Sequence, residues 1–313
     1  FGVYIGKRNT EGGPRRGLFS NSSFRIVAGL RGAIGNDWDY DVSYLYAETS
    51  SDNSFANDFF APNIAKAVDS RLCEPDPTCI PYEVFTYQGV TAEMAAGLTG
   101  VAMASNTSKL DVIEAIVSGD TGWGLNAGNI IMAAGFQWQQ TKYESLMDTV
   151  YENGDLLGQG GPRPSVGGTI RASEYFVEAS VPLISDAEWT DNLTLDLAYR
   201  YSDYNTTGGD STYRAGFDWQ INRPFRLRAG YNRAVRAPSV AELFSPQSIG
   251  LWTGVDPCAG TSPVPSAAAC ARTGVTADQY GTISLSPAGQ YNALYGGNPD
   301  LSVETADTYT AGV

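Results

Sequence analysis

The chain has 313 residues, with 20 basic and 34 acidic side chains, a formal net charge of -14 and no histidine. This acid surplus argues against a nucleic-acid partner, because phosphate binding needs basic patches. Without histidine the chain cannot build a Ser-His-Asp or Cys-His catalytic arrangement or supply imidazole ligands to a metal. No uninterrupted apolar run approaches the roughly 20 residues that a membrane-spanning helix requires.

Alternating apolar and polar residues recur along the chain. In residues 38–48, one face of an extended chain is aromatic and apolar while the other is mostly polar. The apolar face consists of Trp38, Tyr40, Val42, Tyr44 and Tyr46. In chain order, the same alternation is found in residues 23–34, 130–140, 174–184, 192–203, 211–221 and 225–235. Residues 109–119 are ambiguous, because Asp111 and Glu114 fall on opposite faces.

These patterned segments run for about 11 residues, which is the length that a tilted membrane strand needs and about twice the usual length in soluble sheets. Alternation alone also permits a soluble antiparallel sheet that buries its apolar face. The signal of a membrane barrel is weak in any single segment. Both interpretations therefore stay open at this point.

The lengths of the connections favour the membrane barrel. Short connections are expected at 34–37, 121–128, 185–191 and 222–224. Long ones are expected at about 51–108, 143–170 and 237–302, with shorter members at 9–21 and 203–210. Alternation of short and long connections is typical of outer-membrane barrels, which have tight periplasmic turns and large extracellular loops. A short helix is expected within 91–104.

Aromatic side chains fall near both ends of the expected strands. Trp38, Trp189 and Trp219 lie near the short connections. A second set lies towards the long connections and consists of Tyr44, Tyr46, Tyr175, Tyr199, Tyr201, Tyr213 and Tyr231. Two aromatic belts match the interfacial girdles of a membrane barrel. We therefore expect the apolar faces to contact lipid and the polar faces to line the interior.

The four cysteines form two closely spaced pairs, Cys73 with Cys79 and Cys258 with Cys270, each inside one long loop. In an exported protein this pattern predicts two local disulfides. A metal site is the alternative, but the chain lacks histidine and the spacing lacks the CxxC motif of zinc sites. We expect no metal site and no cofactor.

Two blocks near the end of the chain resemble those of TonB-dependent outer-membrane receptors. They are "NRAVRAPSVAELFSP" at 232–246 and "YGGNPDLSVETADTYTAGV" at 295–313. The matching residues are Arg236, Ala237, Pro238, Ser239, Glu242, Leu243, Phe244, Asn298, Pro299, Leu301 and Glu304. The resemblance implies a 22-stranded antiparallel barrel filled by an N-terminal plug, which imports scarce large solutes with energy relayed by TonB.

The chain departs from this family in having no plug, no TonB box and no terminal aromatic residue. We therefore expect residues 1–313 to be about ten long strands of an all-β transmembrane barrel, with the plug and the C-terminal strands outside the chain. Pro238 marks the point where a strand leaves the sheet, and Asn298 with Pro299 predicts a turn. Arg236 is expected in an inward row with Arg226 and Arg228. For these motif residues, loop architecture or packing against the plug is favoured over ligand contact.

Binding is the activity that remains, and the long loops are its expected place. The candidate contacts are Trp252, Asp256, Tyr280, Tyr291 and Tyr295 in the last loop, with Phe59, Phe60, Tyr82, Phe85 and Tyr87 in the second. Exposed aromatic side chains can stack on sugars or chelator rings, and they can equally form the cores of folded loops.

The favoured function is a receptor in the outer membrane of Gram-negative bacteria, with extracellular loops, that imports a metal–siderophore, a corrinoid or an oligosaccharide. Its expected partners are TonB, outer-membrane lipid, lipopolysaccharide and the ligand. The alternatives are a passive porin or structural barrel, and a secreted soluble β-sheet adhesin or polysaccharide hydrolase. No enzyme activity is expected for the favoured function.

Overall fold

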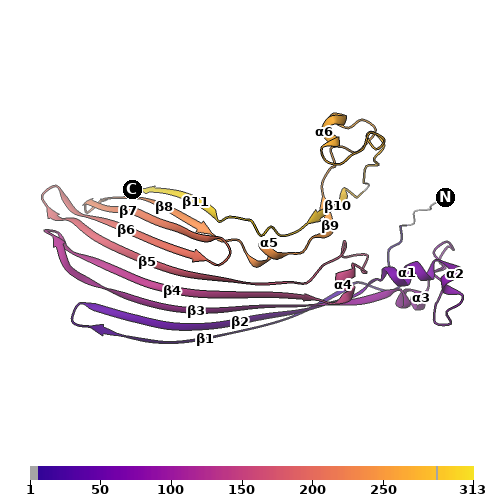
Figure 1. The fold of residues 1–313 in the computed structure, drawn as a ribbon, viewed down its shortest axis with the longest axis horizontal. Helices are drawn as coiled ribbons and strands as arrows, with labels where there is room; N and C mark the ends of the chain where they lie inside the picture. The colour runs from indigo at the N-terminus through magenta and orange to yellow at the C-terminus, as the bar shows by residue number, and fades with distance from the viewer. Residues whose placement is uncertain (1–5, 287) are drawn as a thin grey trace.

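The computed structural model describes residues 6–286 and 288–313. Most of these residues form one curved antiparallel sheet, and the connections at one end of it carry short helices (Figure 1). The strands of this sheet are β1 (Arg16–Ile34), β2 (Trp38–Phe59), β3 (Thr99–Leu125), β4 (Gly128–Met147), β5 (Val166–Ala187), β6 (Thr190–Tyr204), β7 (Gly208–Asn222), β8 (Phe225–Arg236) and β11 (Glu304–Gly312).

Each strand pairs with its neighbour in sequence from β1 to β8, and β11 then pairs with β8. The described sheet thus has nine strands, against the expected number of about ten, with β1 and β11 at its two edges. Two further strands, β9 (Ser248–Thr253) and β10 (Gln290–Tyr295), form a separate hairpin within the connection from β8 to β11. The expected all-β antiparallel class is confirmed.

The strands are longer than the 11 residues expected from sequence, reaching 22 residues in β2 and 27 in β3. The register explains the difference, because β1 and β2 remain paired from Ile34↔Trp38 up to Arg16↔Ala56. Beyond Tyr46 both faces of β2 carry polar residues, so the alternation disappears although the backbone pairing continues. The connections expected at 51–108 and 143–170 therefore shrink to 60–98 and 148–165.

The helices lie in the long connections. The one from β2 to β3 holds α1 (Ala61–Ala67), α2 (Ser70–Cys73) and α3 (Ala92–Gly97), and the one from β4 to β5 holds α4 (Thr149–Asn153). The one from β8 to β11 holds α5 (Val240–Phe244) and α6 (Ala267–Ala271). The helix expected within 91–104 is only α3, since β3 begins at Thr99. None of the described helices has the length and apolar character needed to cross a bilayer.

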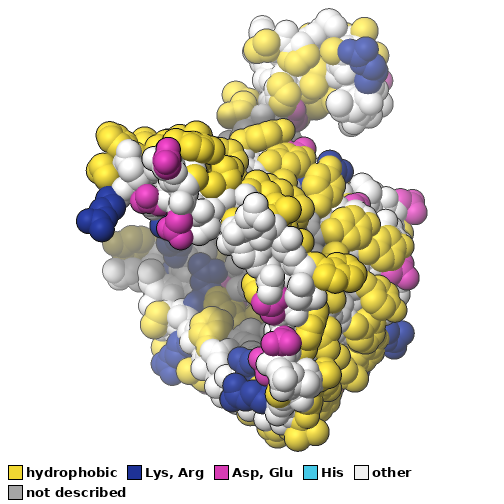
Figure 2. All heavy atoms as spheres, turned by 90° about the vertical axis from the view of Figure 1, so that its left-hand side faces the viewer, with side chains coloured by type: hydrophobic (Ala, Val, Ile, Leu, Met, Phe, Trp, Pro, Cys, Tyr) yellow, Lys and Arg dark blue, Asp and Glu magenta, His cyan; other side chains and the backbone are white. Residues whose placement is uncertain are grey.

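The two faces of the sheet differ in chemistry. Figure 2 looks along the strands from the end with the short turns and shows a convex surface covered by hydrophobic side chains around a hollow that contains basic groups. Directly paired residues share a face, so Val42, Ala115, Phe136, Tyr175 and Tyr201 form one row across β2 to β6. This apolar row belongs to the face that was expected to contact lipid.

The tyrosines of this face lie at the edge of the apolar band, below the strand ends. The Tyr44 hydroxyl donates to Asp111 at 2.7 Å, and Tyr231 donates to Asp307 at 2.8 Å. We expected Tyr44 and Tyr46 near the long connection, whereas β2 continues past them to Phe59. Trp38 and Trp219 do lie near short turns, and Trp189 lies in one.

Candidate functional site

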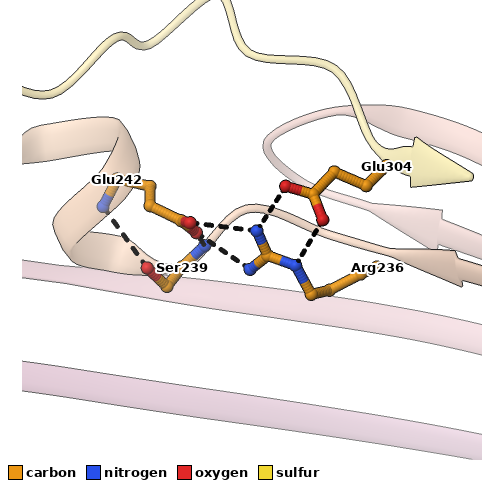
Figure 3. Close-up of polar contacts among 4 residues, drawn as sticks. All are labelled: Arg236, Ser239, Glu242 and Glu304. Atoms are coloured by element: carbon orange, nitrogen blue, oxygen red, sulfur yellow. Dashed lines mark hydrogen bonds and ion pairs between the residues drawn. The ribbon is translucent and has the colours of Figure 1, made fainter.

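The two sequence blocks meet at the end of β8, where Arg236 binds two carboxylates (Figure 3). Arg236 lies opposite Glu304, the first residue of β11. Its Nε and Nη2 donate to Glu304 at 2.9 and 2.7 Å, and its Nη1 and Nη2 donate to Glu242 at 3.0 and 2.9 Å. One guanidinium therefore ties β8, β11 and α5 together, because its planar fork can bind two carboxylates at once.

The start of α5 is fixed by a capping box. The Ser239 hydroxyl accepts a hydrogen bond from the Glu242 N–H at 3.3 Å, and the Glu242 carboxylate accepts one from the Ser239 N–H at 2.7 Å. This arrangement satisfies two backbone donors that a helix start leaves free. The buried Pro238 precedes it, so the chain leaves β8 where the sequence predicted.

The ionised form of the Glu242 side chain is strongly favoured by its surroundings. Its hydrogen bonds from the Arg236 guanidinium, followed by those from Ser239, lower the pKa of the Glu242 carboxyl to about 2. The carboxylate is consequently ionised through the whole physiological range.

Helix α5 is seated on the sheet and on the second block. Val240 and Leu243 are buried, and a Cβ placed at Gly168 of β5 would lie 2.9 Å from Val240 Cγ1. The Asn298 N–H donates to the Glu242 carbonyl at 2.8 Å. Ala237 is partly buried, and Phe244, Pro299 and Leu301 are more exposed.

The expected inward row of positive charge is largely neutralised. Arg236 has its two glutamates, and Arg226 forms an ion pair with Asp218 through Nη2 and a hydrogen bond through Nε at 2.6 Å. Only Arg228 of the three has no ion-pair or hydrogen-bond partner among the described residues. Sequence reasoning placed the arginines correctly by face and missed their acidic partners, which come from β7, β11 and α5.

The aromatic candidates of the β2–β3 connection divide into packed and exposed side chains. Phe59 contacts Tyr82, with ring centroids 6.3 Å apart, in a cluster with Ala67 and Leu98. Phe60 packs against a second buried cluster around Tyr151 and Leu156. Phe85 and Tyr87 are 77% and 90% exposed. Phe59, Phe60 and Tyr82 are therefore packed in the cores of the loops. The rings of Phe85 and Tyr87 are exposed to solvent.

The candidates of the last connection lie on and near the β9–β10 hairpin. Trp252 and Tyr291 are paired across it with ring centroids 6.1 Å apart, and Trp252 is 43% exposed. The Tyr295 hydroxyl donates to the Leu251 carbonyl at 3.2 Å, and the Tyr280 hydroxyl donates to the Pro265 carbonyl at 2.9 Å.

The fifth candidate of this connection, Asp256, binds a backbone N–H group. Its carboxylate accepts a hydrogen bond from the Cys258 N–H at 2.8 Å. Asp256 thus stabilises the turn that leads into the disulfide loop.

The three long connections are joined to one another. Phe60 and Leu156 form an isolated β-bridge, and the Ala61 N–H donates to the Asp155 carbonyl at 2.7 Å. On its other side the β4–β5 connection lies against β9. Gly160 is so close to Leu251 that a Cβ added to the glycine would lie 3.1 Å from Leu251 Cδ1. The candidate ligand-binding surface is therefore one layer of loops, linked through residues 148–165.

Both predicted disulfides are present. Cys73 is bonded to Cys79 and Cys258 to Cys270, with Cα–Cα distances of 5.3 and 5.9 Å. Each bond closes a short segment of one connection. Among residues 6–286 and 288–313, no three Cys, Asp or Glu side chains are grouped so that they could hold a metal ion.

The long strands, the lipid-type convex face and the polar hollow define an outer-membrane type of β-barrel wall. The family model described as "TonB dependent receptor-like, beta-barrel" matches residues 2–313. The chain belongs to the TonB-dependent receptor family and forms part of its barrel domain. Members of this family are outer-membrane proteins that act as receptors.

A solved structure shows the same fold. The siderophore receptor PirA from Acinetobacter baumannii is similar with a TM-score of 0.52 at 13% identity, over 93% of this chain and 32% of that one. A mutant of the ferric enterobactin receptor PfeA from Pseudomonas aeruginosa gives 0.49 at 15% identity, over 92% and 31%. The chain thus spans about a third of the length of these receptors. No curated protein sequence matches it.

Proposed function

We propose that the chain is the barrel segment of a receptor that imports a scarce large solute, such as a metal–siderophore, a corrinoid or an oligosaccharide, with energy supplied through TonB. The plug and the TonB box would lie outside the 313 residues, and the loop layer would face the cell exterior. Membership of the TonB-dependent receptor family is the observation that carries this proposal. The apolar convex face supports contact with outer-membrane lipid and lipopolysaccharide.

Ligand contact is proposed for the exposed members of the aromatic set. Phe85 and Tyr87 of the second long connection and Trp252 with Tyr295 of the hairpin present ring surface to solvent. The two groups belong to connections that residues 148–165 join. Phe59, Phe60 and Tyr82 would support the surface from within by packing.

The energy source is tested with the full-length protein in cells that contain or lack TonB. Accumulation of candidate solutes is measured in both strains, and capture of the periplasmic domain of TonB is measured with the extracted receptor. Uptake that needs TonB, together with capture, is expected. Equal uptake without TonB and no capture would indicate a passive porin.

The ligand surface is tested with Trp252→Ala. Trp189, which is 61% exposed in a short turn at the opposite end of the strands, offers a matched control as Trp189→Ala. Loss of a stacking contact is expected to weaken solute binding about tenfold in the first variant. Equal affinities of both variants and the parent would remove Trp252 from the proposed surface.

A further inference from the structure

The apolar face of the sheet carries three basic residues on β3, β4 and β5, above its apolar band. Lys109 of β3 lies directly opposite Lys142 of β4. Arg171 of β5 lies opposite Gln140, two residues before Lys142, so Arg171 is the diagonal neighbour of Lys142. Phe136, six residues before Lys142, belongs to the apolar face, and alternation places the three basic residues on that face too. Lys109, Lys142 and Arg171 are called the basic cluster.

The basic cluster faces neither the interior of the barrel nor an open edge of the sheet. β3, β4 and β5 are paired on both sides with described strands, in the order β2-β3-β4-β5-β6 (Figure 1). Neither a plug inside the barrel nor further strands at its edges would cover the outward side chains of these three strands. The side chains of Lys109 and Lys142 are 41% and 49% exposed. In the complete barrel their surroundings are the membrane and the water above it.

The positive charges of the two lysines are loosely compensated. Like charges directly opposite each other on neighbouring strands are destabilising. The Lys109 ammonium is 3.4 Å from Glu48, and the Lys142 ammonium is 3.5 Å from Glu144, both longer than a usual charge-assisted hydrogen bond. Glu48 lies on the far side of Lys109 from Lys142, and Glu144 lies two residues beyond Lys142. The two acids therefore flank the lysine pair and do not separate it.

Arg171 keeps most of its donors for a further partner. Its Nε donates to Gln140 Oε1 at 2.7 Å. Its backbone is held by Asn205, whose Oδ1 accepts from the Arg171 N–H at 2.7 Å. The guanidinium forms no salt bridge within residues 6–286 and 288–313. The nearby carboxylate of Asp111, opposite Gln140, accepts the hydrogen bond of the Tyr44 hydroxyl. A phosphate group beside Arg171 would therefore meet unused donors in a fork.

The basic cluster lies just beyond the aromatic edge of the apolar band. Tyr44, Ile113 and Trp138 form one row across β2, β3 and β4. Lys109 and Lys142 are each four residues further along their strands, which is about 13 Å of strand and roughly 9 Å of height at the usual tilt. Aromatic side chains mark the boundary between hydrocarbon and headgroups. The cluster is thus at the level of the lipid headgroups.

Hydroxyl groups follow above the basic cluster on the same face. The hydroxyls of Ser22 and Ser50 are 2.8 Å apart, and the Ser105 hydroxyl donates to Asp52 at 2.7 Å. From the short turns upwards, the face therefore offers apolar, aromatic, basic and then hydroxyl-bearing side chains. A lipopolysaccharide molecule presents its acyl chains, its phosphates and its sugars in the same order.

We propose that Lys109, Lys142 and Arg171 bind a phosphate group of the lipid A part of lipopolysaccharide. The acyl chains would lie along the apolar band, and the sugars would lie against the serine-rich rows above. Glu48 and Glu144 would face the divalent cations that bridge neighbouring phosphates, since carboxylates and phosphates bind such a cation together. The site rests on the proposed function in one respect: the loop layer must face the cell exterior, because lipopolysaccharide occupies the outer leaflet.

Binding is measured by native mass spectrometry of the delipidated, full-length receptor in detergent. The probes are bisphosphorylated lipid A, monophosphoryl lipid A and phosphatidylglycerol, and bisphosphorylated lipid A is expected to bind most tightly. Each basic group beside an anionic lipid headgroup contributes about fivefold in affinity. Lys109→Gln/Lys142→Gln should therefore raise the Kd for bisphosphorylated lipid A roughly 25-fold, and Arg171→Gln should raise it about fivefold.

Two matched variants separate charge from folding. Lys109→Arg/Lys142→Arg keeps both charges and should keep the affinity of the parent. Arg25→Gln/Arg31→Gln removes two charges from the opposite face of β1 and should leave the Kd for lipid A unchanged. Heat-dependent gel mobility shows that each variant is folded.

Two results would overturn the proposal. One is an equal Kd for lipid A in the parent and in Lys109→Gln/Lys142→Gln. The other is equal binding of phosphatidylglycerol and bisphosphorylated lipid A by the parent, which would make the basic cluster a general contact for anionic lipid. Solute uptake and TonB capture are separate measurements. Loss of lipid A binding with TonB-dependent uptake intact removes this site alone, and uptake without TonB removes the import function alone.

Discussion

Gly161 lies against the backbone of Ile249, so that a Cβ at Gly161 would stand 2.6 Å from the Ile249 carbonyl oxygen. This contact joins the connection between β4 and β5 to the β9–β10 hairpin. Gly161 also has a φ of +139°, a conformation that favours glycine. Both the close approach and the backbone angle depend on the missing side chain.

Gly161→Ala is therefore expected to loosen the hairpin. The strained backbone alone costs about 1–3 kcal/mol, and the collision with Ile249 adds to it. Amide hydrogen exchange in β9 and β10 should accelerate by roughly tenfold. Gly274→Ala is the matched control, because Gly274 has a φ of +96° but no atom within 4 Å of its Cβ position. Equal acceleration in both variants would show that contact with Ile249 does not hold the hairpin.

The stabilising salt bridge of Glu242 is expected to persist to a lower pH than that of a glutamate with an ordinary pKa. Folding lowers the pKa of Glu242 to about 2 from its ordinary value of 4.5, so its contribution to stability is fully present above about pH 4.5 and is lost as pH falls through 2. At pH 6, amides of α5 should exchange faster in Glu242→Gln than in the parent. The difference should shrink from pH 4.5 downwards and vanish below 2. A difference that disappears already near pH 4.5 would mean an ordinary pKa.

The assignment of the two faces is tested by one neighbouring pair. Val42 belongs to the apolar face of β2, and its neighbour Ser43 belongs to the polar face. Val42→Arg should destabilise the membrane-inserted barrel by about 2–4 kcal/mol, because it places a charge in hydrocarbon. Ser43→Arg should have little effect. Urea unfolding of the full-length receptor in lipid vesicles measures both, and the reverse order of stabilities would invert the assignment.

Loss of the Cys258–Cys270 disulfide should act locally. The bond closes a segment with a sequence separation of 12, and loop-closure entropy then corresponds to about 3 kcal/mol. In Cys258→Ser/Cys270→Ser, proteolysis within 255–286 should accelerate while the unfolding midpoint of the sheet stays the same. A lower unfolding midpoint of the whole barrel would show that the disulfide-bonded segment is coupled to the sheet.

The sequence predicted the sheet best where one face meets lipid. Trp38, Tyr40 and Val42 alternate with polar residues, and the structure places them in β2 as expected. For the part of the same strand beyond Tyr46 the sequence predicts a loop, because Ser50 to Asn53 are polar on both faces. Pairing with β1 and β3 holds that part in the sheet, and periodicity cannot report such pairing.

The sequence predicted which residues belong to the candidate site, but it did not predict which of them contact one another. Arg236, Glu242 and Glu304 were found by resemblance, and Arg236 also by its row, but nothing in the sequence indicated that the three would contact one another. That meeting depends on the register of β8 with β11, which are separated by a long connection. The β9–β10 hairpin was missed for the same reason, since it depends on pairing between distant segments.

In the proposed importer, the extension of β3 beyond its apolar band would separate capture of a solute from its passage. Residues 99–110 add about 40 Å of strand above Asp111, which corresponds to roughly 30 Å of height at the usual tilt. A molecule held by the loop layer is thus still about a bilayer's thickness away from the level of Asp111. In the proposed importer, docking at the rim and entry into the pore would be distinct steps in space, and a particle too bulky for the pore could still bind at the rim.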